Sequence, residues 1–314
     1  MAGTNSNTIR SSFVVETVAG TTNATPAWRT MHVLAPFTDE TVRFHQKTLT
    51  GNGSTVGDAL LDRKVNGKIS NAPMTYGLYD VFLESLLRSS FSADVMTNGI
   101  GRQTMSFENN FTAGQTGAQT YLRYRGVEVV SGQIKIDEAM QVTQSFDLLG
   151  MSSSDTGGGL IAGATYTDPV NKDPFAAQGD VGLVTFGTYT PDGIASMTLD
   201  FKYETIDPQG AIGQDALIGI ARGGFVPVIT VKFYIDSNFA AFRDAARQTT
   251  QTPVKVTVNL GSVTLKKYKL EFWTCYVDMA APDYGGASMF QTVTIMPQYS
   301  PGNNGVLTVT RAIA

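Results

Sequence analysis

The stretch YLRYRGVEVVSGQIKIDEAMQVTQSFDLLGM, residues 121–151, decides the fold. Its last part, residues 141–148, alternates polar and apolar side chains, with the period of two that is typical of a strand with one buried and one wet face. Upstream, the apolar phase slips by one residue near Ser131-Gly132, where a bulge would restore the pairing. The polar turn Asp137-Glu138-Ala139 then joins two predicted strands.

The composition favours strands and turns over long surface helices. Charged residues make up 16% of the 314-residue chain and glycine occurs 32 times, whereas an ordinary domain has about a quarter charged residues. With 23 basic and 27 acidic side chains, the net charge is -4. A protein that grips nucleic acid through its phosphates needs more positive charge than this.

Residue types that commonly carry catalysis or bind metals are scarce in the sequence. The chain has one cysteine, Cys275, within an apolar run, and two histidines, His32 and His45, whose spacing gathers no metal ligands. It contains no G-x-S-x-G elbow and no phosphate loop, and the Asp137-Glu138 pair is typical of a turn. We therefore expect no enzyme activity, no metal and no cofactor.

Nothing in the sequence predicts export or membrane insertion. The opening MAGTNSNTIR has no apolar core, so no signal peptide is expected. There is also no run of about 18 apolar residues. Synthesis in the cytoplasm is the expected default.

The order of predicted elements repeats along the chain. Each half reads as a strand, a long glycine-rich loop, a strand, one helix and four further strands. The helices are predicted at 76–90 and 237–247, the second with Asp236 or Ser237 as N-cap. The fold class is therefore mainly β, with two repeated antiparallel β-sandwich or barrel domains, each flanked by one helix. The predicted boundaries are a first domain with an N-terminal arm at 1–151, a Ser/Gly-rich linker at 152–164 and a second domain at 165–314.

Two motifs carry a resemblance to a known family. They are G-V-x-V-x-S-x-x-I-x-I at 126–136 and V-T-x-S-F-D-L-x-G at 142–150, supported by the stretches at 223–239 and 166–175. With these, the chain resembles the tail tube proteins, or major tail proteins, of bacteriophages with long non-contractile tails, in the two-domain branch.

The resemblance implies a structural subunit of the virion tail, made in the host bacterial cytoplasm. Such subunits form stacked rings around a tape-measure protein, meet a tail terminator and tail-tip proteins, and conduct the genome during ejection. A duplicated chain could close a pseudo-sixfold ring with three copies. DNA should pass without specific binding, so we expect a neutral to acidic lumen.

The resemblance also places candidate assembly residues by position. The long loops at 51–62 and 207–222 and the N-terminal arm are candidates for contacts between rings. The candidate ring-stacking residues are Gly51, Gly53, Ser54, Thr55, Gly57, Asp58, Gln209, Gln214 and Asp215. The candidate inner-barrel strand carries Val127, Val129, Ser131, Gln133 and Lys135. An ordinary interior strand of a sandwich explains the latter pattern equally well.

Other functions remain open on sequence grounds. A tail terminator, a secretion-system tube protein or a decoration protein would share the β-rich fold, but such proteins are usually shorter. A glycan-binding module or a β-sandwich hydrolase would need aromatic platforms or paired carboxylates in a cleft. Only two tryptophans are present, Trp28 in a predicted loop and Trp273 in an apolar strand.

Overall fold

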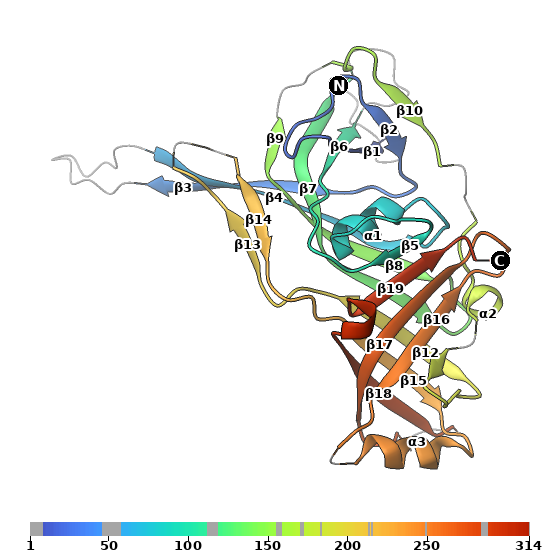
Figure 1. Ribbon diagram of the computed structural model, residues 1–314. Coiled ribbons are helices and arrows are strands. Elements are labelled where there is room, and N and C mark those ends of the chain that lie inside the picture. The colour runs from blue at the N-terminus through green and yellow to red at the C-terminus, as the bar shows by residue number, and fades with distance from the viewer. Residues whose placement is uncertain are drawn as a thin grey trace.

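The computed structural model describes residues 9–45, 58–111, 119–154, 159–169, 173–182, 184–212, 214, 216–248, 250–283 and 288–313 (Figure 1). The strands of the first half are β1 (Arg10–Val15), β2 (Ala27–Thr30), β3 (Phe37–His45), β4 (Asp58–Pro73), β5 (Val95–Thr97), β6 (Met105–Asn110), β7 (Tyr121–Asp137), β8 (Thr143–Gly150) and β9 (Ser152–Ser154). The later strands are β10 (Thr165–Thr167), β11 (Thr185–Phe186), β12 (Ile194–Phe201), β13 (Ile206–Gln209), β14 (Gly219–Arg222), β15 (Val228–Tyr234), β16 (Val254–Leu260), β17 (Tyr268–Met279), β18 (Phe290–Gln298) and β19 (Leu307–Arg311). The helices are α1 (Asp80–Leu87), α2 (Ala177–Asp180) and α3 (Phe239–Ala246), with the 3-10 turn η2 (Pro301–Asn303).

The predicted mainly-β antiparallel class is confirmed. One run of eight strands passes through both halves of the chain, in the order β3, β4, β8, β7, β12, β15, β18, β17, and each neighbouring pair is antiparallel. We call this run the long sheet. Around it lie smaller groups of strands, including β2, β1 and β6 of the first half, which β10 of the second half joins beside β2.

Strand β7 joins these groups. Its first part pairs with β6 and β9, and its second part pairs with β8 and β12. The predicted bulge is confirmed, because the β7–β8 register shifts between Val129 and Ser131. Strand β7 continues through residue 126 without a break. Gly126 takes φ +62°, and its N–H donates to Glu16 Oε1 at 2.9 Å, so the chain bends there within one strand.

The two halves have the same strand order. In the first, β4, β8 and β7 lie side by side and α1 follows β4. In the second, β15, β18 and β17 lie side by side and α3 follows β15. Both helices are shorter than predicted. The predicted side-chain cap of α3 is absent, because Asn238 holds the N-cap position and Asp236 accepts a hydrogen bond from the Asn238 N–H within the preceding turn.

Aromatic side chains fill the core of each half. Phe82 of α1 packs on Phe13, Phe107 and Phe146, with ring centroids 4.9 to 5.9 Å apart. In the second half, Phe233 of β15 contacts several rings, those of Phe186, Tyr189, Phe239 and Phe242. Trp28 was predicted in a loop but lies in β2, fully buried. Each helix thus packs on a later strand of its own half, α1 on β7 and α3 on β17, since its apolar residues need a buried partner surface.

The halves are also joined by main-chain pairing and by buried polar contacts. Residues 152–154 of the predicted linker form β9 against β7, while β12 pairs with the other end of β7. Tyr268 of β17 donates its hydroxyl proton to Asp80 of α1, and Arg311 Nη1 lies 2.5 Å from the second Asp80 oxygen. The division into two domains stays a prediction, and in the structure described here the halves share one sheet.

Leu199 tests the pairing of β7 with β12. It is fully buried opposite Ile134, so Leu199→Ala should lower the free energy of unfolding by about 2–5 kcal/mol through lost burial and a cavity. The neighbouring Thr198→Ala should change it by about 0.5 kcal/mol or less. Urea unfolding of both variants measures the difference. Equal effects would contradict the assignment of Leu199 to the core side of β12 and of Thr198 to its other side.

Candidate assembly surface

One face of the long sheet packs on the core and the other carries polar side chains. Along β12, Met197, Leu199 and Phe201 are buried, whereas Thr198 and Asp200 point the other way and are partly exposed. The same alternation runs through β15 and β18. We call the polar side the outer face, and it follows from the period of two in these strands.

Threonines dominate one row across the outer face. Paired positions on six adjacent strands form this row, which consists of Thr143, Lys135, Thr198, Thr230, Thr294 and Asp278. Four of the six are short, neutral hydroxyl side chains. The row therefore offers hydrogen-bonding groups with little charge along the width of the sheet.

Several charged groups of the outer face have partners within the sheet. Lys68 Nζ lies 3.5 Å from Asp147, and Lys135 Nζ lies 2.7 Å from Asp137. Asp200 accepts a 2.6 Å hydrogen bond from the Gln133 amide, across the contact between β7 and β12. These exposed pairs contribute little stability. Because opposite charges lie next to each other, these positions are locally neutral and carry no run of like charge.

The bulge in β7 distributes the predicted barrel residues over two faces. Val127 and Val129 are fully buried in the core. Beyond the register shift, Ser131, Gln133 and Lys135 lie on the outer face instead. One extra residue reverses the facing of an alternating strand. These five residues thus share a strand but no common surface, and membership of an inner barrel stays a prediction.

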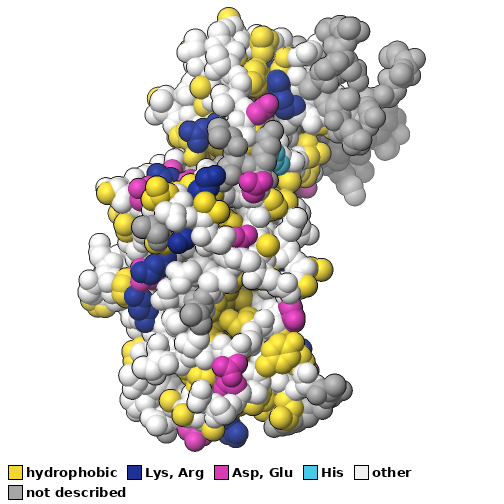
Figure 2. Space-filling view, turned by 90° about the vertical axis from the view of Figure 1, so that its right-hand side faces the viewer, with side chains coloured by type: hydrophobic (Ala, Val, Ile, Leu, Met, Phe, Trp, Pro, Cys, Tyr) yellow, Lys and Arg dark blue, Asp and Glu magenta, His cyan; other side chains and the backbone are white. Residues whose placement is uncertain are grey.

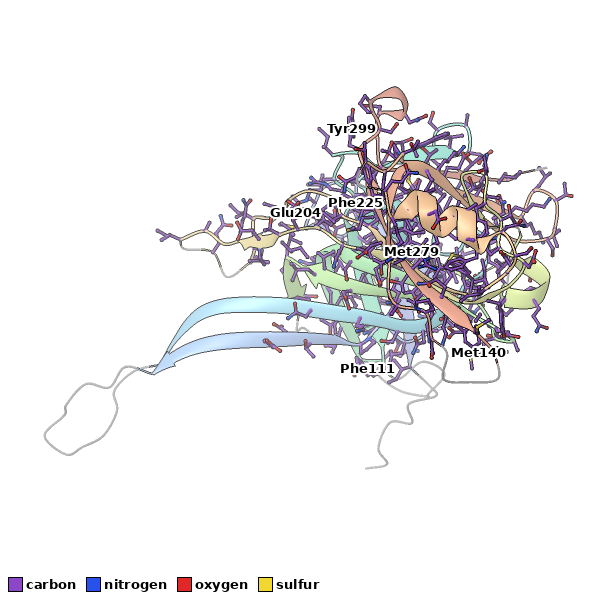
Figure 3. All side chains as sticks on the ribbon, turned by 90° about the horizontal axis from the view of Figure 1, so that it is seen from below. Phe111, Met140, Glu204, Phe225, Met279 and Tyr299 are labelled. Carbon is purple, nitrogen blue, oxygen red and sulfur yellow. The ribbon has the colours of Figure 1, made fainter. Side chains whose placement is uncertain are left out.

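Two hairpins project from the long sheet in the same direction (Figures 1 and 3). They are β3–β4 and β13–β14. Of the predicted stacking residues, Gly51, Gly53, Ser54, Thr55, Gly57 and Asp215 lie outside the described residues. Asp58 begins β4, Gln209 ends β13, and Gln214 lies in the connection to β14. Gln209 and Gln214 are both exposed.

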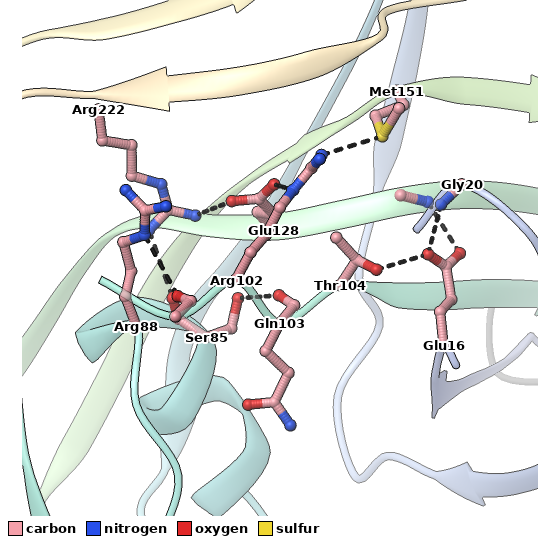
Figure 4. Close-up of polar contacts among 12 residues, drawn as sticks. Glu16, Gly20, Ser85, Arg88, Arg102, Gln103, Thr104, Glu128, Met151 and Arg222 are labelled. Carbon is pink, nitrogen blue, oxygen red and sulfur yellow. Dashed lines mark hydrogen bonds and ion pairs between the residues drawn. The ribbon is translucent and has the colours of Figure 1, made fainter. Parts of the chain in front are cut away.

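A buried ion cluster fastens the β13–β14 hairpin to β7 (Figure 4). Glu128 Oε2 accepts from Arg222 Nη2 at 2.6 Å, and its Oε1 accepts from Arg102 Nε at 2.6 Å. Arg222 also donates to the Ser85 carbonyl of α1, and its side chain is 0% exposed. Ile220 packs beside this cluster on Val130 and Leu149. Sequence reasoning missed this site, although a lone acid within the apolar Val127–Val130 run was its signal.

The acidic turn after β7 has structural partners. Asp137 pairs with Lys135, and Glu138 Oε2 lies 3.3 Å from the Tyr234 hydroxyl. The Glu138 charge raises the pKa of Tyr234. Among the described residues, no group of three or more His, Cys, Asp or Glu side chains could hold a metal ion. None of the described helices is long and apolar enough to cross a membrane.

Arg222→Met tests the hairpin anchor. Removing the buried guanidinium leaves Glu128 with one partner, so the free energy of unfolding should fall by about 3–5 kcal/mol. Arg102 is 31% exposed, so Arg102→Met should cost only about 1 kcal/mol. Chemical unfolding measures both, and limited proteolysis should cleave the β13–β14 hairpin faster in Arg222→Met alone. Equal unfolding and cleavage in the two variants would contradict the anchor.

Comparison with known proteins identifies the family. A search of curated proteins found no match. A family model described as phage tail tube protein matches residues 6–308, nearly the whole chain and every strand of the long sheet. The family is one of structural virion components rather than enzymes. The chain therefore belongs to the phage tail tube protein family and is a structural component of a bacteriophage tail.

Proposed function

We propose that this chain assembles into stacked trimeric rings that form a hollow conduit for the genome in a long, non-contractile tail. The observation that carries this is the long sheet, in which two sets of strands with the same order are joined side by side through β7 and β12. A contact that joins one half to the next can recur between chains. Repetition of such a head-to-tail contact closes a ring when the rotation permits it.

The matching halves support three copies per ring. Strand order, antiparallel sense and helix position agree between the halves, which is the expectation for an internal duplication. Each chain then supplies two of the six positions in the sixfold ring that the resemblance implies. The predicted domains at 1–151 and 165–314 would be those two units.

The outer face is the proposed wall of the lumen. Its threonine row and its paired lysines and aspartates give a polar surface with no excess of positive charge. A bore that conducts DNA must not hold successive phosphates, since each lysine contact adds affinity. On the side of the molecule in Figure 2, basic and acidic side chains are also interspersed.

The two projecting hairpins are the proposed contacts between rings. They leave the long sheet in one direction, and the Glu128 cluster gives the second hairpin a fixed base. Stacking identical rings generates an open filament. A tape-measure protein, a terminator and tail-tip proteins are the partners proposed for this filament.

Negative-stain electron microscopy tests the ring. The purified full chain, examined at rising concentration and with isolated tail tips as nuclei, should form hollow tubes. End-on averages should show six lobes with threefold modulation. Six equivalent lobes from six chains would contradict the trimer, and single rings that never stack would favour a terminator-like role. Dispersed monomers under both conditions would overturn the tube.

Thr230→Lys tests the lumen assignment. Thr230 is partly exposed at the middle of the threonine row. With one added lysine per chain facing the bore, tubes should retain short double-stranded DNA at low salt and release it as salt rises. The control is Gln248→Lys, which adds the same charge at an exposed position after α3, outside the strands of the long sheet. This control should leave DNA retention at the wild-type level, and equal retention by both variants would contradict a lumen formed by the outer face.

A further inference from the structure

A cavity of about 610 Å³ lies where the two halves of the chain meet. Tyr76 and Leu78, which follow β4, and Pro169, which follows β10, give it apolar walls. Arg29 of β2 and Lys266 of the connection between β16 and β17 also line it, and both of these side chains are exposed. We call it the basic cavity. Apolar walls with a few charged groups are typical of a binding site.

Positive charge exceeds negative charge in the lining of the basic cavity. Among the described lining residues, Asp168 is the one carboxylate, against the two cations Arg29 and Lys266. Asp168 Oδ1 already accepts a hydrogen bond from Thr30 Oγ1 at 2.5 Å. The cavity therefore suits a partner that brings apolar side chains together with negative charge.

The basic cavity and the two projecting hairpins lie at opposite ends of the same strands. Strand β4 runs from the β3–β4 hairpin at Asp58 to Pro73, and Tyr76 follows this far end. Pro73 shares a row of paired residues with Thr198 of β12. From that row, β12 runs to Phe201 and the β13–β14 hairpin. Figure 1 accordingly shows the hairpins on one side of the molecule and β10 on the other. Rings stacked in one polarity bring the hairpins of one ring to the cavity end of the next.

The β13–β14 hairpin has the chemistry that the basic cavity suits. Ile212 is fully exposed and Ile218 is half exposed, although apolar side chains gathered on a projecting element usually mark a contact surface. Residues 206–221 include Asp207 and Asp215 but no lysine or arginine. This hairpin therefore combines apolar side chains with negative charge.

The β3–β4 hairpin has the opposite charge. Basic residues outnumber acidic ones in its sequence from residue 43 to residue 64, which contains Arg43, Lys47, Arg63 and Lys64 against Asp58 and Asp62. Like charges would meet if this hairpin entered the basic cavity. Charge thus favours the β13–β14 hairpin as the occupant.

A second cavity, of about 460 Å³, lies at the same end of the long sheet. The turn after β7 and the first residues of β12 line it. Asp137, Glu138 and Asp192 are among its described lining residues, which include no lysine or arginine. We call it the acidic cavity. Its charge would repel the β13–β14 hairpin, so the two cavities are not equivalent acceptors.

We propose that the β13–β14 hairpin of one chain docks into the basic cavity of a second copy in the next ring. Ile212 packs on the apolar walls, and the acidic side chains of the hairpin meet Arg29 and Lys266. Each chain has one such hairpin and one such cavity, so docking determines which half of the next ring each hairpin meets. This inference rests on the proposed tube and adds the acceptor site for stacking.

Chemical cross-linking in assembled full-chain tubes tests the acceptor. Ile212→Cys is combined with Thr167→Cys, since Thr167 is exposed and lines the basic cavity. A short bismaleimide should join these thiols from ring to ring and give a ladder of species larger than a trimer on a denaturing gel. Each single variant should give no ladder. Native Cys275 should stay unreacted, because burial raises the pKa of its thiol to about 12.

The matched control places the second cysteine in the acidic cavity. Gln178 is exposed and lines that cavity, so Ile212→Cys with Gln178→Cys should cross-link at least tenfold more slowly. Exposed Gln214 lies near the same tip, and Gln214→Cys repeats both arms if loss of the isoleucine itself prevents stacking. Tubes that link faster to Gln178→Cys, or that do not link to Thr167→Cys, would overturn the acceptor and leave the tube intact. If the wild-type chain forms no tubes, the proposed function itself fails, and this inference fails with it.

Discussion

The antiparallel pairing of β7 with β12 is the interaction on which the rest of the structure depends. It is main-chain hydrogen bonding between one segment of each half of the chain, Gly132–Asp137 and Ser196–Phe201. Without it, each half would leave an unpaired edge in the middle of the molecule, with unsatisfied N–H and C=O groups. With it, two sets of strands become one sheet with a core face and an outer face.

Buried charged groups hold this arrangement at both ends. Glu128 binds the arginines that reach it from β14 and from the loop before β6, while Asp80 of α1 binds Tyr268 and Arg311 of the second half. Each carboxylate meets partners from different parts of the chain. Removing both partners of either carboxylate would leave a buried charge unpaired, which is costly. These buried contacts therefore hold the two halves in one relative position, as a repeating ring contact requires.

The sequence predicted what local patterns determine. Alternation identified most strands, the phase slip at Ser131-Gly132 located the bulge, and the repeated element order gave the common topology. These features follow from the period of side chains along a strand, which a short window contains. Helix ends were less accurate, since packing on the sheet rather than local propensity ends α1 and α3.

The remaining features depend on contacts between distant residues. The serines at 152–154 have the composition of a linker, but they pair with the edge of β7 and form β9. Trp28 looks like loop until β1 and β10 pair on either side of its short strand. The Glu128 cluster joins three residues that no spacing rule in the sequence connects. The face of β7 that carries Glu128 also became clear only once the bulge was located.

Cryo-electron microscopy of the assembled tube tests the central claim most directly, because it shows the contact between chains beside the contact within one chain. The expected result is a ring of three chains whose six halves are related by rotations of about 60° around the tube axis, with the outer face toward the bore. A ring of six chains, or a ring in which the outer face points away from the axis, would contradict this arrangement.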